Sequence, residues 1–167
     1  MSKISRFSIV YDPAEDRLAL DAATADGGTT RLWITQRLCR GLVGALAPML
    51  EGRTPDQPRP VQQQAAVQSW EQAAAMAEFG KVPGVRPEPQ SVVGLVNAAH
   101  IRPVPQGVVL TFSFTPDGER TVELGGPALR QTLAVIHRLA VAAGWPTDYW
   151  PRWIADPGAV AAPDQLN

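Results

Sequence analysis

The sequence has few of the residues that build metal centres and covalent cross-links. Its 167 residues include one cysteine, Cys39, and two histidines, His100 and His137. A single cysteine excludes an internal disulfide framework and a zinc site built from cysteines. Two histidines are too few for a multi-histidine centre. We therefore expect no metal and no other cofactor.

An excess of charge of one sign is also missing. Fifteen basic and 16 acidic side chains leave a net charge of -1. The signs balance along the chain, with six of each in residues 1–52, four of each in 53–91, and five basic against six acidic in 92–167. Nucleic-acid binding depends largely on phosphate neutralisation by clustered basic side chains. A nucleic-acid partner is therefore not expected, and a polybasic membrane anchor is disfavoured for the same reason.

Long apolar runs are absent as well. No window approaches the length of about 18 uninterrupted apolar residues that a spanning helix needs. The first eleven residues contain no apolar stretch of signal-peptide length. We expect no membrane partner and a cytoplasmic location.

The composition that remains is that of an ordinary globular protein, with 45% apolar and 19% charged residues. A chain of this length buries roughly 70% of its unfolded surface, enough for a core without staples. Alternating apolar residues predict strands at 7–11, 18–22 and 29–35, and Asp26-Gly27-Gly28 is typical of a hairpin turn. A helix should follow, with Thr35 as its N-cap and a Leu38 stripe on its apolar side.

The middle of the chain predicts a linker followed by a helix. Residues 51–61 contain three prolines, and residues 62–79 are rich in strong helix formers. The most apolar face of this helix comprises Val67, Trp70 and four alanines, Ala66, Ala73, Ala74 and Ala77. Small side chains suit close packing, so we expect this face to lie against another helix.

The last third repeats the opening order of elements. Strands are predicted at 91–102, 108–115 and 120–124, before a helix that opens at Pro127 and ends at Gly144. Asp26-Gly27 recurs as Asp117-Gly118, 91 positions later. We predict an α+β fold of two pseudo-repeated βββα units with one or two antiparallel sheets, joined by the alanine-rich helix. The units span 1–52 and 91–144, the linker with its helix 53–90 and an aromatic, proline-rich tail 145–167, all within one compact domain.

Catalytic signatures are missing. The sequence has no phosphate-binding glycine loop, nucleophile elbow or zinc-binding His-Glu-x-x-His helix. Cys39 falls on the apolar side of its helix and is expected to be a small buried side chain. No carboxylate is placed by sequence to orient His100 or His137 for acid–base work. We name no catalytic residue.

Two groups of residues are candidates for binding. No acidic residue lies between Asp26 and Glu51, a window that holds Arg31, Trp33, Arg37 and Arg40. Guanidinium groups there could bind a phosphate, a carboxylate or an acidic surface, unless they are simply a solvated helix face. The tail concentrates three of the five tryptophans, and Tyr149, Trp150 and Trp153 could form an interface or fold back on the chain's own core.

These observations favour a protein that works through protein contacts, with another protein or a second copy of itself, and without an internal reaction centre. Two alternatives stay open. One is an anion- or nucleic-acid-binding regulator that uses Arg31, Arg37 and Arg40. The other is an enzyme of an unfamiliar type, which would need a histidine and a carboxylate to converge in a pocket.

Overall fold

A computed structural model describes residues 2–52, 61–80, 83–116 and 118–158. Residues predicted as linker at 53–60 and as tail at 159–167 lie outside this part, as does Asp117 of the second predicted turn. The protein has both helices and strands, which confirms the α+β class. The six strands are β1 (Ser2–Asp12), β2 (Arg17–Thr24), β3 (Thr29–Ile34), β4 (Val92–Val104), β5 (Gly107–Thr115) and β6 (Gly118–Gly125).

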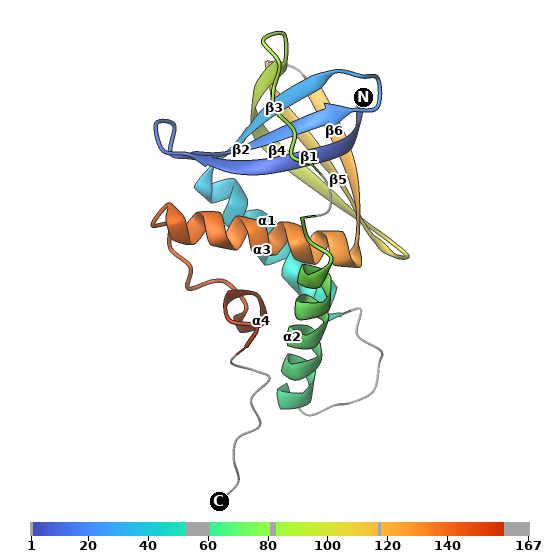
Figure 1. Ribbon diagram of the computed structural model, residues 1–167, viewed down its shortest axis with the longest axis vertical. Coiled ribbons are helices and arrows are strands. Elements are labelled where there is room, and N and C mark those ends of the chain that lie inside the picture. Colours follow the sequence, from blue (N-terminus) through green and yellow to red (C-terminus); the bar gives the residue numbers. More distant parts are fainter. Residues whose placement is uncertain (1, 53–60, 81–82, 117, 159–167) are drawn as a thin grey trace, which may run out of the picture.

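The strands close into one barrel in the order β1-β2-β3-β4-β5-β6, visible in the upper half of Figure 1. Pairing is antiparallel within β1-β2-β3 and within β4-β5-β6. The two groups of strands meet through parallel pairs, β3 with β4 and β6 with β1. The prediction of one or two antiparallel sheets is therefore wrong. Sequence alternation reports which side chains are buried, and it carries no information on which strands become neighbours.

Local signals placed the strands well. In β3, Leu32 and Ile34 are buried while Arg31 and Trp33 are half-buried, as the alternation predicts. The first hairpin turns at Asp26-Gly27-Gly28, where Gly27 has a φ of 90° that a side-chain-bearing residue rarely adopts.

Two helices of similar length follow the two groups of strands. Helix α1 (Gln36–Glu51) starts at the predicted cap, where Leu38 N donates to Thr35 Oγ1 at 3.2 Å. It continues through Pro48 and ends at Gly52. Helix α3 (Gly126–Ala142) carries proline in its first turn, and Gly144 beyond it has a φ of 70°.

The helices form a second layer beside the barrel. Figure 1 shows α1 and α3 crossing next to one side of the barrel, with α2 (Val61–Ala77) and the short α4 (Arg152–Ala155) beyond them. Helix α2 packs against α3 and α4, whereas α3 also contacts β1, β5 and β6. One continuous core joins the layers and includes Leu18 and Leu32 of the barrel, Val43 of α1, and Leu129 and Leu133 of α3.

Candidate functional site

Helix α2 is docked by its polar side. Gln68, Ser69 and Gln72 are only 3%, 2% and 0% exposed, whereas Trp70 is 79% exposed. The prediction that the alanine and tryptophan face packs against another helix is therefore wrong, because five of its six residues are exposed and Val67 is half-buried. A hydrophobic face normally turns inward, and here a hydrogen-bonding partner on α3 has overridden that preference.

The partner is Arg130, a charged residue within the buried stripe of α3 and only 4% exposed. Its guanidinium donates to the Gln68 backbone carbonyl at 3.3 Å and to Gln68 Oε1 at 2.6 Å, and it forms an ion pair with Glu71. In return, Gln72 Nε2 donates to the Arg130 carbonyl at 3.1 Å. The guanidinium also lies 5.0 Å from the ring centre of Trp153. These bonds fix which side of α2 faces inward.

The outward side of α2 presents an apolar stripe. It consists of Ala66, Trp70, Ala73, Ala74 and Ala77, all exposed. From Ala66 the other four lie at i+4, i+7, i+8 and i+11, the spacing with which a helix lies in a groove on another protein. Helix α2 contains no lysine or arginine. We call these five residues the Trp70 stripe.

The predicted arginine group does not form a set of free guanidinium groups. Arg31 is held by Asp21 on the neighbouring strand, with bonds of 2.7 and 2.8 Å, and it stacks 5.4 Å from the Trp33 ring. The hydrogen bond to Asp21 raises the pKa of Arg31. Arg40 lies 5.1 Å from the ring centre of Tyr149, and Arg37 is exposed. The Arg31 guanidinium is therefore already paired with the Asp21 carboxylate and is not available to a bound anion.

The aromatic segment folds back on its own chain. Trp150 and Trp153 are 6% and 5% exposed. Trp153 Nε1 donates to Glu51 Oε1 at 2.9 Å, and the Tyr149 ring stacks on Trp150 at 5.8 Å. Tyr149 is half-buried. The two tryptophans are core residues and offer little surface to a partner.

Cys39 and His137 are partly or fully buried, and burial favours their neutral forms. Cys39 is buried, and burial raises the pKa of its thiol to about 11. His137 packs edge-on against Trp150, and burial lowers the pKa of its imidazole. His100 is exposed on β4. Among the described residues, no group of three or more His, Cys, Asp or Glu side chains could hold a metal ion.

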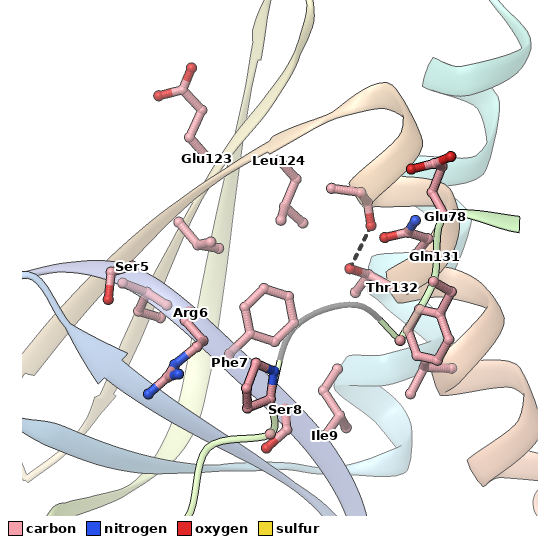
Figure 2. A pocket seen from close by; sticks show the side chains of 18 residues that line it. Ser5, Arg6, Phe7, Ser8, Ile9, Glu78, Glu123, Leu124, Gln131 and Thr132 are labelled. Carbon is pink, nitrogen blue, oxygen red and sulfur yellow. Dashed lines mark hydrogen bonds between the residues drawn. The ribbon is translucent and has the colours of Figure 1, made fainter. Parts of the chain in front are cut away.

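A pocket of about 500 Å³ opens between β1, β6 and α3, near the end of α2 (Figure 2). No signal in the sequence located it. Its lining residues are Ile4, Ser5, Arg6, Phe7, Ser8, Ile9, Glu78, Phe79, Gly80, Pro83, Gly84, Val122, Glu123, Leu124, Ala128, Gln131, Thr132 and Val135. Half of these are apolar side chains from three elements and one loop, and neither the arginine group nor the aromatic tail contributes.

No protein-family model, curated protein or solved structure matches this chain. Function must therefore be argued from the site itself. Within the described residues, no helix combines the length and the apolar character needed to cross a bilayer.

Proposed function

We propose that this chain is a non-enzymatic protein-interaction module, and that α2 is its docking helix. The Trp70 stripe would lie in an apolar groove of a partner protein, with Trp70 as the central anchor. The observation that carries the proposal is the orientation of α2, which buries glutamine and serine and leaves an indole 79% exposed.

The energetics favour such an anchor. An aromatic side chain buries about 150–250 Å² on binding. At about 25 cal/mol per Å² this area is worth several kcal/mol before the costs of association. Tryptophan is enriched among residues that dominate binding energy. The alanines on either side would let the walls of a groove approach the α2 backbone closely.

The size of the stripe argues for a groove and against a second copy of α2. A helix of 17 residues is about 25 Å long, so one face about 10 Å wide offers roughly 250 Å². A stable interface buries about 800 Å² per partner. Two α2 helices packed face to face fall well short of this area, whereas the walls of a groove could also cover the polar flanks of the outward side of α2. Because α2 contains one glutamate and no basic side chain, a neutral or basic rim would suit it.

The alternatives receive less support. An anion-binding regulator would use Arg31, whose guanidinium is already paired with Asp21. An enzyme would need a reactive thiolate or a positioned base. Burial disfavours the Cys39 thiolate, and His137 packs against Trp150 and is not among the residues that line the pocket.

We also propose that the two βββα units are an internal repeat within one compact domain. The order β1-β2-β3-α1 recurs as β4-β5-β6-α3. Both junctions between the groups of strands are parallel pairs, as a two-fold rotation about the barrel would require.

Site-specific photo-crosslinking tests the docking helix. The chain would carry p-benzoylphenylalanine in place of Trp70 and be irradiated in its native cells. We expect a discrete adduct with a different protein, and a several-fold weaker adduct when Ala74→Lys places a charge in the stripe. The same probe at Val141, which is 56% exposed on α3, is the matched control and should give no such adduct. Equal adducts at both positions, or none at position 70, would contradict the proposal. An adduct between two copies of this chain would show that the stripe contacts a second copy and not a different protein.

A further inference from the structure

The pocket lies between β1 and β6, beyond the residues at which these two strands pair. Among the described residues, β1 and β6 pair at two positions, Ser2 with Arg120 and Lys3 with Thr121. From Ile4 onward β1 lines the pocket on one side, and Val122 to Leu124 of β6 line it on the other. Helix α3 borders this opening and lines the pocket with Ala128, Gln131, Thr132 and Val135.

The walls are suited to an apolar ligand. Phe7 and Leu124 face the interior in Figure 2, and Ile9, Val122, Val135 and Phe79 add further apolar surface. A volume of about 500 Å³ lies within the range of about 300–1,000 Å³ that is usual for small-molecule sites. The charged groups of Arg6 and Glu123 point away from the Phe7 ring, so they leave the interior apolar.

One end of the pocket carries hydrogen-bond acceptors. The Thr132 hydroxyl donates its proton to the Ala128 carbonyl at 2.8 Å, so toward the pocket its oxygen can only accept. Gln131 Nε2 donates to the Ala75 carbonyl at 2.7 Å, which commits one of its amide protons to α2. The carboxylate of Glu78 lies at the same end (Figure 2). A ligand donor fits Thr132 Oγ1, whereas a ligand carboxylate there would find the hydroxyl proton already donated to the Ala128 carbonyl.

We propose that this pocket binds a small molecule with an apolar body and a terminal hydrogen-bond donor, an amine or an alcohol, with the donor directed to Thr132 Oγ1. The site is independent of the Trp70 stripe, because Trp70 is not among its lining residues. Failure of either proposal leaves the other intact.

Displacement of a fluorescent aromatic amine tests the site. We would titrate 1-aminoanthracene into the full chain and compete it with octylamine, octan-1-ol and octanoate, which share one apolar body. We expect one probe per chain, displacement by the amine and the alcohol, and at least tenfold weaker displacement by octanoate. Equal potency of octanoate would overturn the donor head group, and absence of stoichiometric probe binding would overturn the site.

Two variants locate the binding. Ala128→Phe should fill the pocket and abolish probe binding, while Val141→Phe, on an exposed position of the same helix, should not change it. Thr132→Val keeps the shape of the side chain and removes the acceptor, so octylamine should bind about fivefold more weakly, the effect of one ordinary hydrogen bond. If Ala128→Phe unfolds the chain, the Thr132→Val result decides. Unchanged affinity in Thr132→Val would overturn the assigned head-group contact.

Discussion

Arg130 is a charged side chain buried on α3. It follows Leu129 of the apolar stripe and is itself 4% exposed. Burial lowers the pKa of the Arg130 guanidinium, and the charge of Glu71 opposes that effect. A buried charge is tolerated only when it is paired and hydrogen-bonded, and α2 supplies both. On α2, Ser69 Oγ and Gln72 Oε1 are buried without a hydrogen-bond partner among the described residues.

We predict that Arg130→Ala weakens the fold by about 2–4 kcal/mol, because Gln68 and Glu71 lose their partner and the Gln68 carbonyl groups stay buried. Urea unfolding followed by circular dichroism would measure the loss. Arg138→Ala is the control, since Arg138 is exposed on the same helix and its guanidinium lies 5.5 Å from the ring centre of Phe79. Its substitution should cost less than about 1 kcal/mol. Equal effects would show that Arg130 does not hold α2.

Other site residues show which of their properties could be predicted from the sequence and which could not. Alternation in β3 placed Arg31 and Trp33 on one side of the strand, and that prediction is confirmed. The partner of Arg31 could not be predicted, because Asp21 becomes its neighbour only through the register of β2 against β3. Trp70 was recognised as the one large residue of its face, and its exposure followed from a side chain on a helix 60 positions away.

At the scale of the elements, helix α1 contains two glycines, Gly41 and Gly44, and each costs about 1 kcal/mol of helix stability relative to alanine. No close neighbour requires them: among the described residues, a Cβ added at either position would meet no heavy atom within 4 Å. Gly107, at the start of β5, is different. A Cβ there would lie 1.9 Å from the Leu124 carbonyl oxygen of the adjacent strand. Composition cannot distinguish these cases, because the crowding comes from another element.

We predict opposite effects for alanine at these positions. Gly44→Ala should stabilise the protein by about 0.5–1 kcal/mol, since it removes backbone freedom from the unfolded chain without a clash. Gly107→Ala should destabilise it by about 2–3 kcal/mol, because backbone must move in β5 or β6. Midpoints of urea unfolding provide the comparison. Destabilisation by Gly44→Ala would mean that something does cover that face of α1.

On the scale of the whole molecule, closure of the barrel joins the start of the chain to its second half. Strand β1 pairs with β6. Strand β3 pairs with β4, although α1 and the alanine-rich helix lie between these two strands in the sequence. Neither group of three strands closes on its own, and each would leave two unpaired edges. The core also runs without interruption from the barrel into α1, α3 and α4.

We therefore predict a single cooperative unfolding transition. Far-ultraviolet circular dichroism reports both layers, whereas tryptophan fluorescence reports mainly the helical layer, where Trp145, Trp150 and Trp153 are buried. The two signals should give the same urea midpoint within error. Separate midpoints would show that the barrel and the helices, or the two βββα units, unfold independently.

The sequence by itself determined the local elements: the alternation of the strands, the Thr35 cap, the Asp26-Gly27 turn and the apolar stripes of α1 and α3. These features depend on residues within a few positions of one another. Barrel closure, the parallel seams, the pocket and the outward face of α2 depend on contacts between residues tens of positions apart. Only the tertiary structure could decide them. In α2, for example, the hydrogen bonds that the buried Arg130 requires outweighed the preference of an alanine and tryptophan face for the core.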